Sequence, residues 1–168
     1  SIVRPGDVYG PKCRPWVIQS MEMIKAGKML LPANGKGVFT PVYIDDIVEG
    51  IVLAASKAEA SGQIFTMDGG AQITCEDYFG HLYRFLGKND TPRSVGTGTA
   101  VFIAEVVGRF ERLLGKPSEL GKNTVGMLAR KGGYSIEKAR RLLGYDPKVN
   151  LDEGMQRVKQ WLDSEGQL

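Results

Sequence analysis

Apolar and polar residues follow one another along the chain in blocks that favour a mixed α/β fold. Apolar positions at helical spacing predict several amphipathic helices, and short runs of β-branched and aromatic residues predict extended segments between them. The expected helices lie at 16–24, 46–55, 74–86, 103–114, 135–144 and 150–162, and the expected extended segments at 2–3, 38–44 and 63–67. Pro41 places the segment 38–44 at a sheet edge or a bulge. The segment from Ser118 to Arg130 has only a weak pattern.

Cap residues that are followed three positions later by an acidic residue mark the start of three of these helices. Asp46 with Glu49 has the form of a capping box, in which Asp46 accepts from first-turn amides; Thr74 and Asn150 begin two more helices in the same way. The helix after Asp46 carries an apolar stripe, which we expect to be buried. The stripe consists of Ile47, Val48, Ile51, Val52 and Ala55.

Composition narrows the class of protein. The chain has 168 residues, 42% hydrophobic and 24% charged, which is enough for one globular domain with a core. Its net charge of +3 comes from 22 basic and 19 acidic residues without runs of one sign, so nucleic acid is not an expected partner. The most apolar stretch, 100–107, is interrupted by Glu105 and is too short to span a membrane. With no signal-peptide pattern, a soluble cytoplasmic protein is expected.

The cysteines and the single histidine do not indicate a metal site. Cys13 and Cys75 lie far apart and form no C-x-x-C pair, so reduced thiols are expected rather than zinc or a disulfide framework. His81 is the only histidine and lies among aromatic residues on an expected helix, so a packing or surface role is expected for it. Asp45 and Asp46 are neighbours on a helix and diverge by about 100°, which favours capping over shared acid–base chemistry.

The segment from Arg4 to Pro11 is the most informative stretch. It directly follows Ile2 and Val3, and its Pro and Gly residues predict that a buried strand ends here and runs into a loop. Loops at the carboxyl ends of strands in open α/β sheets line the ligand crevice. We therefore expect this loop to be functional.

Four motifs occur along the chain in a specific order. They are R-P-G-D-V-Y-G-P, P-V-Y-I-D-D-I-V-E-G-I-V-L-A-A, G-Q-I-F-T-M-D-G-G and Y-S-I-E-K-A-R-R-L-L-G-Y-D-P-K-V-N-L-D-E-G. Together they resemble the C-terminal half of extended short-chain dehydrogenases, a family of NAD(P)-dependent epimerases, dehydratases and reductases of the dihydroflavonol-reductase and 3β-hydroxysteroid-dehydrogenase kind. The resemblance covers nearly the whole chain.

The resemblance implies an α/β fold that forms the C-terminal portion of a Rossmann-type fold, interleaved with a small, mostly helical substrate-binding lobe over residues 1–168. The N-terminal dinucleotide-binding half, with its glycine-rich turn and Tyr-x-x-x-Lys, is expected outside this chain and is its implied partner. NAD or NADP is the implied cofactor, and no catalytic residue is expected here. By resemblance, a four-residue segment lines the nicotinamide through main-chain groups, and two further residues line the substrate. The cofactor residues are Pro5, Gly6, Asp7 and Val8, and the substrate residues are Tyr9 and Phe39.

Two short matches to the missing elements fail on physical grounds. Gly96-Thr97-Gly98 precedes a helix, but Val101 stands where a dinucleotide fingerprint needs its third glycine. Tyr134 and Lys138 match Tyr-x-x-x-Lys, but Ser135 is expected to cap the helix and leave Tyr134 outside it. Neither pair is expected to act in cofactor binding or proton transfer.

Three functions stay open at this point. The leading hypothesis is part of an NAD(P)-dependent oxidoreductase or epimerase acting on a carbinol or ketone carbon of a non-nucleotide small molecule, inactive as an isolated fragment. The second is a fragment of a nucleotide-sugar epimerase or dehydratase. The third is a non-catalytic module that binds a ligand or self-associates through its apolar helix stripe, and a homodimer is open in each case. Phe39 favours the first, because nucleotide-sugar members usually carry a phosphate-binding arginine at the aligned position.

Overall fold

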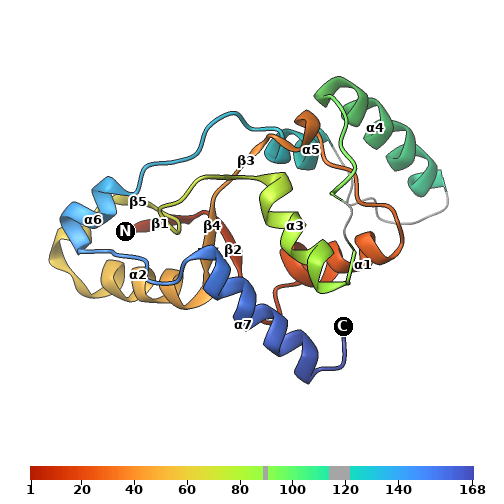
Figure 1. Ribbon diagram of the computed structural model, residues 1–168. Helices are drawn as coiled ribbons and strands as arrows, with labels where there is room; N and C mark the ends of the chain where they lie inside the picture. Colours follow the sequence, from red (N-terminus) through yellow and green to blue (C-terminus); the bar gives the residue numbers. More distant parts are fainter. Residues whose placement is uncertain (89–90, 114–121) are drawn as a thin grey trace. The chain divides into compact units, whose positions relative to one another are not determined.

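The computed structural model describes residues 1–88, 91–113 and 122–168 (Figure 1). The predicted end of a helix at Leu114 and the first residues of the weakly patterned segment, from Ser118, lie outside the described residues. The chain divides into two compact units, which we describe separately. Unit 1 comprises Ser1–Glu22, Thr40–Ile73 and Gly133–Leu168, and unit 2 comprises Met23–Phe39 and Thr74–Gly132.

The sheet of unit 1 is built from two parallel pairs. Strand β1 (Ile2–Pro5) pairs with β5 (Ile64–Met67), and β2 (Asp7–Tyr9) pairs with β4 (Pro41–Tyr43). The prediction of a loop directly after β1 is therefore wrong, because the chain is interrupted only at Gly6, continues as a second strand, and turns from Gly10 onward. Pro41 is the first residue of β4, where its missing N–H costs no ladder bond.

Strands β5 and β4 lie on opposite edges of the β1–β2 segment. The amide of Gly6 donates to the carbonyl of Met67 at 2.9 Å, whereas the amide of the next residue, Asp7, donates to the carbonyl of Thr40 at 2.8 Å. Successive residues of a strand direct their main-chain groups to opposite edges. The chain therefore changes its pairing partner at Gly6.

Three helices cover unit 1. They are α2 (Ile44–Ser56), α6 (Glu137–Leu143) and α7 (Leu151–Ser164). The turns η1 (Arg14–Ile18) and η3 (Ala58–Ala60) belong to the same unit, and α1 (Gln19–Lys25) begins in it. The core includes Val42, Ile47, Ala54, Phe65, Met67, Ala139, Leu143 and Tyr145.

Unit 2 is mostly helical. It contains α3 (Cys75–Phe85), α4 (Thr97–Leu113), α5 (Lys122–Leu128), the turn η2 (Ala33–Gly35) and the short strand β3 (Val38–Phe39), which pairs with β6 (Ile73–Thr74). The predicted capping box at the start of α3 is confirmed, with the side chain of Thr74 accepting from Asp77 N and that of Asp77 accepting from Thr74 N. The side chain of Asn150 likewise caps α7 by accepting from the amide of Glu153 at 3.0 Å.

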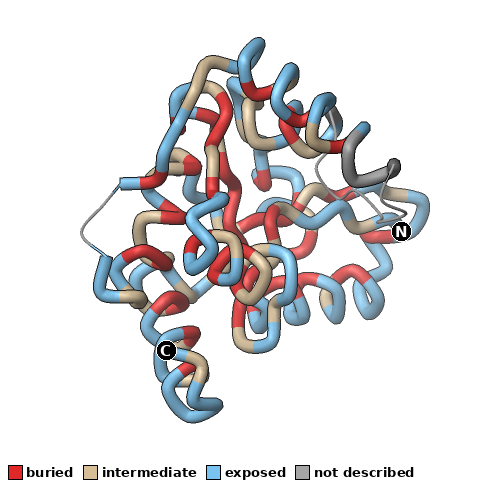
Figure 2. Tube along the Cα trace, turned by 90° about the vertical axis from the view of Figure 1, so that its right-hand side faces the viewer, coloured by how far each residue is buried: buried red, intermediate tan, exposed pale blue. Residues whose placement is uncertain are grey.

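Helix α2 departs from its prediction. It begins at Ile44, two residues earlier than expected, with Tyr43 in the cap position, so the cap assigned to Asp46 is wrong. Its buried side consists of Asp46, Ile47, Gly50 and Ala54. Of the predicted stripe only Ile47 is buried, while Val48, Ile51 and Val52 are 50%, 49% and 58% exposed. Figure 2 shows such alternation of buried and exposed positions along the helices.

Candidate functional site

The candidate site is the junction at the carboxyl ends of β1 and β5, where Gly6 meets the turn that follows β5. A Cβ atom at Gly6 would lie 2.5 Å from the carbonyl oxygen of Thr40 and 2.7 Å from Cβ of Asp68. A Cβ atom at Gly69 would lie 2.4 Å from the carbonyl oxygen of Pro41. Only glycine fits both positions, so the backbones of these segments pack directly on one another.

Asp7 anchors this junction. Its side chain is buried, and its Oδ2 accepts from the amide of Thr40 at 2.9 Å and lies 3.3 Å from the Thr40 hydroxyl. A carboxylate held in this way aligns β2 with the start of β4. The geometry assigns Asp7 an orienting role.

Two further hydrogen bonds, which involve Asp68 and Tyr145, hold the turn after β5. Oδ1 of Asp68 accepts from the amide of Gly70 at 2.7 Å, and the hydroxyl of Tyr145 donates to the carbonyl of Asp68 at 3.0 Å. Burial, with nearby carboxylates, raises the pKa of Tyr145 above its ordinary value, so the phenol stays a donor. The junction is thus rigid on both sides of Gly6.

The remaining residues of the segment present main-chain groups. Pro5 is exposed, and Gly6 and Val8 are partly exposed. Because Asp7 directs its main chain to β4, the amide and carbonyl of Val8 face away from β4. The thiol of Cys13 donates to the Val8 carbonyl at 3.4 Å, and burial raises the pKa of that thiol. The segment can therefore offer uncharged hydrogen-bonding groups to a ligand at the carboxyl ends of the strands.

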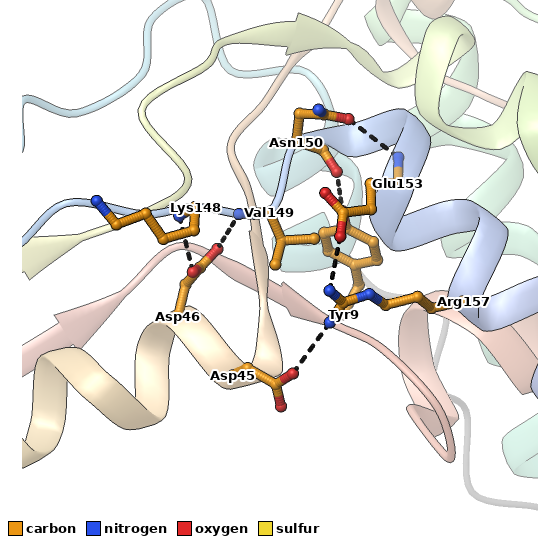
Figure 3. Close-up of polar contacts among 8 residues, drawn as sticks. All are labelled: Tyr9, Asp45, Asp46, Lys148, Val149, Asn150, Glu153 and Arg157. Atoms are coloured by element: carbon orange, nitrogen blue, oxygen red, sulfur yellow. Dashed lines mark hydrogen bonds and ion pairs between the residues drawn. The ribbon is translucent and has the colours of Figure 1, made fainter.

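Tyr9, at the end of β2, is packed inside unit 1 and is 2% exposed. Its ring meets the ring of Tyr43 edge-on, with centroids 5.6 Å apart and planes at 76°. Its hydroxyl lies 3.5 Å from the carbonyl oxygen of Asn150, next to the N-terminus of α7 (Figure 3). Burial, followed by the charge of Tyr43 and of Asp46, raises the pKa of Tyr9.

Asp46 joins α2 to the segment before α7. Its two carboxylate oxygens accept from the amides of Lys148 at 2.9 Å and Val149 at 3.1 Å (Figure 3). The sequence showed Asp46 only as a local helix signal, because a partner about a hundred positions away leaves no mark in a local pattern. This clamp positions the start of α7 against Tyr9.

A surface ion-pair cluster lies beside the clamp. The guanidinium of Arg157 contacts Glu153 at 2.6 Å and Asp45 at 3.3 Å, and lies 5.2 Å from the centre of the Tyr43 ring (Figure 3). Hydrogen bonds that the guanidinium donates to the side chains of Glu153 and Tyr43 raise the pKa of Arg157. These exposed charges tie α7 to α2 and β4 but lie outside the junction.

Phe39 belongs to unit 2, whereas the other predicted site residues belong to unit 1. It is 1% exposed and packs on Tyr78, with ring centroids 4.3 Å apart, and on Phe79, at 6.0 Å. The ring is thus part of an aromatic cluster with helix α3. Contact of Tyr9 or Phe39 with a substrate stays a prediction.

The prediction for the Tyr-x-x-x-Lys match is confirmed for Tyr134, which stays outside the helix, but the predicted cap at Ser135 is wrong. Tyr134 lies outside α6, which begins at Glu137, and Ser135 Oγ accepts from the amide of Glu137 at 3.3 Å, although the cap position itself is Ile136. Lys138 donates to the carbonyl of Ile64 at 3.0 Å. The lysine thereby covers the outer edge of β5.

Among residues 1–88, 91–113 and 122–168, no group of three or more His, Cys, Asp or Glu side chains is placed to hold a metal ion. None of the helices within those ranges combines the length and apolar character that crossing a membrane requires.

Comparison with known proteins finds enzymes among the relatives of this chain. It is 27% identical to the 2-alkyl-3-oxoalkanoate reductase of Stenotrophomonas maltophilia, over 94% of this chain and 49% of the reductase. It is 26% identical to the decarboxylating sterol-4-alpha-carboxylate 3-dehydrogenase of Saccharomyces cerevisiae, over 96% of this chain and 49% of that enzyme. The chain therefore spans about half the length of these curated relatives.

Solved structures agree on the fold. The UDP-glucuronic acid 4-epimerase of Bacillus cereus, in complex with UDP-glucuronic acid and NAD, superposes with a TM-score of 0.65 at 22% identity, over 98% of this chain and 45% of the epimerase. No protein-family model matches the chain. The resemblance drawn from the four motifs is nevertheless confirmed: the chain is similar, over nearly its whole length, to about half of the NAD-dependent epimerases, dehydratases and 3β-hydroxysteroid-dehydrogenase-like enzymes, and it has their Rossmann-type α/β fold.

Proposed function

We propose that this chain forms the C-terminal, substrate-side half of an NAD(P)-dependent oxidoreductase or epimerase that acts on a carbinol or ketone carbon of a non-nucleotide substrate. The observation that carries the proposal is the glycine junction at Gly6 and Gly69, which brings main-chain groups to the carboxyl ends of β1 and β5. Ligands of open α/β sheets bind at this end of the strands. The names of the two sequence relatives support an oxidoreductase.

Pro5, Gly6, Asp7 and Val8 fit a nicotinamide ring and its carboxamide. Asp7 fixes the direction of the segment, Gly6 lets the backbones approach, and the neutral amide and carbonyl of Val8 match the hydrogen-bonding groups of a carboxamide. The cofactor, when bound, would supply the hydride acceptor or donor. This chain's residues would hold and orient it, and the proton would move on groups of the N-terminal half.

The substrate proposal rests on Phe39 and on the relatives. A phenyl ring cannot give phosphate the forked, charged donors of an arginine. The two sequence relatives are named for an alkyl oxoalkanoate and a sterol carboxylate. A neutral or largely apolar carbonyl or carbinol compound is therefore our proposed substrate class. Because Tyr9 and Phe39 are buried, we propose that they shape the substrate-facing segments by packing behind them.

Nucleotide-sugar epimerisation or dehydration is the alternative. The Bacillus cereus epimerase has this chemistry, but at 22% identity the likeness supports the fold and not the substrate. A non-catalytic module is the third proposal, favoured by the exposed apolar residues of α2. A cytoplasmic location belongs to the leading proposal.

The test uses the full-length protein beside residues 1–168 alone. Titration with NADH and NADPH, followed by nicotinamide fluorescence, is expected to give micromolar binding for the full-length protein and binding no tighter than about millimolar for the chain alone, because the pyrophosphate site lies outside it. A substrate panel is expected to show turnover of apolar ketones and weak inhibition by UDP. Tight UDP binding with sugar epimerisation would favour the alternative, and no cofactor binding at all would favour the module.

A further inference from the structure

The loop that follows β2 carries two basic side chains, Lys12 and Arg14, without a counter-ion in the chain. Both residues are exposed. Within residues 1–88, 91–113 and 122–168, neither side chain makes a hydrogen bond or an ion pair. Unpaired basic side chains are ordinary on a protein surface, so the conformation and the place of these two must show whether they have a function.

The backbone at Lys12 has a conformation that lysine rarely adopts. The amide of Cys13 donates to the carbonyl of Gly10 at 3.2 Å, which closes a turn with Pro11 and Lys12 at its two central positions. Lys12 has a φ of 64°, in the left-handed region where the Cβ atom of an L residue is crowded. A turn with proline first and a positive φ second normally has glycine or asparagine at the second position. Lysine costs stability here, which indicates that its side chain has a function.

The same turn folds back on the segment proposed to hold the nicotinamide. It begins directly after β2, whose parallel partner β4 ends at the same level of the sheet. The thiol of Cys13 donates to the carbonyl of Val8 at 3.4 Å. Consecutive Cα atoms are about 3.8 Å apart, so Lys12 and Arg14, which flank Cys13, both start within side-chain reach of a ligand bound at Val8.

A structural ion pair does not account for the two basic side chains. A Cβ atom at Gly10 would lie 2.8 Å from Cγ2 of Ile44, so the start of the turn packs on the first residue of α2. The carboxylate of the next residue, Asp45, is already paired with Arg157 at 3.3 Å. Unit 1 has more acidic than basic residues, yet none of its described carboxylates contacts either side chain. Both cations are therefore available to an anion from solution.

We propose that Lys12 and Arg14 bind a carboxylate group of the substrate, so that the enzyme acts on a hydroxy acid or an oxo acid. This site rests on the proposed function and narrows its substrate class from apolar alcohols and ketones to those that also carry an acid group. The ammonium and guanidinium groups hold the carboxylate by charge-assisted hydrogen bonds. They orient the substrate and take no part in bond making, and the carboxylate leaves the reaction unchanged.

A carboxylate fits this place better than a phosphate does. The turn contacts Val8, beside which the reacting carbon of the substrate must lie, and a carboxylate can be attached within a few bonds of such a carbon. The diphosphate of a nucleotide sugar is separated from the reacting carbon by the sugar ring. The pyrophosphate of the cofactor is expected at a glycine-rich turn and helix N-terminus of the other half.

The experiment measures oxidation of β-hydroxydecanoate and of its methyl ester by the full-length protein, with whichever of NAD and NADP it binds. The two compounds share one carbon skeleton and differ in the charge of the acid group. Lys12→Gly is expected to lower kcat/KM at least about tenfold for the acid, mainly through KM, and by at most about twofold for the ester. Because glycine suits a φ of 64°, this variant is expected to keep its melting temperature within about 2 °C or to raise it.

Three further variants separate a local site from a general effect of charge. Arg14→Gln is expected to act like Lys12→Gly on the acid. Lys12→Arg keeps the positive charge and is expected to retain kcat/KM for the acid within about threefold. The matched control is Lys159→Gln, which removes the same charge from an exposed position on α7 and is expected to change neither substrate by more than about twofold.

The outcomes distinguish this site from the proposed function. Equal losses for acid and ester, no loss for either, or oxidation of the ester alone would overturn the carboxylate site and leave the proposed function standing. Weaker UDP binding in Lys12→Gly, with the acid unaffected, would assign the cations to phosphate. Absence of NADH and NADPH binding would refute the proposed function. In that case, or if neither compound is oxidised, calorimetric titration with decanoate decides: the site holds if Lys12→Gly weakens binding at least about tenfold, and fails if decanoate does not bind or binds both proteins equally.

Discussion

The carboxylate of Asp46, buried in α2, accepts a hydrogen bond from the main-chain amide of Val149 at 3.1 Å, while its other oxygen accepts from Lys148 at 2.9 Å. These bonds fix the residues that lead into α7. Removal of a buried acceptor leaves two amides without partners and takes away charge-assisted bonds. We expect Asp46→Ala to lower the free energy of unfolding by about 3 kcal/mol in urea denaturation.

Asp45→Ala is the matched control, because Asp45 is the neighbouring residue on the same helix and its carboxylate is exposed. Its contact with Arg157 is a solvent-exposed ion pair at 3.3 Å. The loss of stability is expected to be clearly smaller than for Asp46→Ala. Equal losses in the two variants would show that helix-start charge, not the tertiary clamp, is what matters.

The hydrogen bonds of Asp46 also show which kind of contact a local sequence pattern does not predict. Asp46, Thr74 and Asn150 share one local pattern, an acidic or polar residue followed three positions later by another, and two of the three are helix caps. Asp46 differs because strand β4 runs directly into α2, so the helix begins before Asp46 and turns its carboxylate towards a distant loop. Propensity and spacing could predict the helix, but its partner depends on tertiary packing.

The pairing of the strands is a second feature that the local sequence pattern did not predict. Pro and Gly in the segment from Arg4 to Pro11 predicted a loop, yet the chain is interrupted at Gly6, continues as β2 over Asp7–Tyr9 and turns only from Gly10 onward. The segment stays extended because its pairing partner changes from β5 to β4, two strands that are distant in sequence. The buried stripe predicted on α2 failed for a related reason, since apolar spacing indicates that a surface needs cover but does not say which polypeptide segment provides it.

Gly154 in α7 is a position where no side chain fits. A Cβ atom there would lie 2.1 Å from the hydroxyl of Tyr9 and 3.0 Å from Cδ2 of Tyr43. Gly154→Ala is therefore expected to destabilise the chain by about 2 kcal/mol, although alanine favours helices, because the core must shift. Thermal and chemical denaturation would measure the loss.

Gly126→Ala in α5 provides the comparison, since a Cβ atom at Gly126 meets nothing within 4 Å. This substitution is expected to be neutral or to stabilise by about 0.5 kcal/mol through helix propensity. The double variant Gly154→Ala with Tyr9→Phe is expected to recover part of the loss by removing the closest contact. A Gly154→Ala variant as stable as Gly126→Ala would contradict the packing of Tyr9 described here.

The buried tyrosines predict how stability depends on alkaline pH. Burial raises the pKa of both Tyr9 and Tyr145 above the ordinary value of 10.0. Between that value and the higher folded-state pKa, the unfolded chain loses a phenolic proton that the folded chain keeps, so stability is fully present below pH 10 and falls as pH rises. The slope is at most about 1.4 kcal/mol per pH unit for each tyrosine.

Tyr9→Phe isolates one of these groups. Its hydroxyl lies 3.5 Å from the Asn150 carbonyl oxygen, which is long for a hydrogen bond between these groups, so the variant is expected to keep most of its stability at pH 7 and to lose less than the parent chain between pH 10 and 11. Tyr145→Phe should also flatten the alkaline slope, but with a loss at pH 7 because the hydrogen bond to Asp68 is removed. Parallel slopes in all three proteins would show that neither phenol governs the alkaline transition.

Gly6 belongs both to the packed junction of unit 1 and to the proposed nicotinamide segment. In residues 1–168, Gly6→Ala is expected to cost about 2 kcal/mol, because the added methyl group meets the Thr40 carbonyl and the Asp68 side chain. In the full-length protein it is expected to weaken NADH binding at least about tenfold by displacing the proposed nicotinamide segment. Gly96→Ala, at a position with open space, is expected to change neither measurement. Unchanged NADH affinity in a folded Gly6→Ala protein would remove this segment from the cofactor site.

One substitution at Phe39 distinguishes a role of this residue in core packing from a role in contacting the substrate. The ring is 1% exposed and packs on Tyr78 and Phe79, so a guanidinium placed there would be buried among aromatic rings. Phe39→Arg is therefore expected to destabilise the protein by more than about 4 kcal/mol and to give no binding of UDP in calorimetric titration. The matched control is Phe102→Arg, the same substitution on α4 at a side chain that is 67% exposed, which is expected to fold normally. A Phe39→Arg protein that folds as well as Phe102→Arg and gains affinity for UDP would show that position 39 faces the substrate. The substitution would then have restored the arginine of nucleotide-sugar enzymes. In that case the phenyl ring would be a specificity residue and not part of the core.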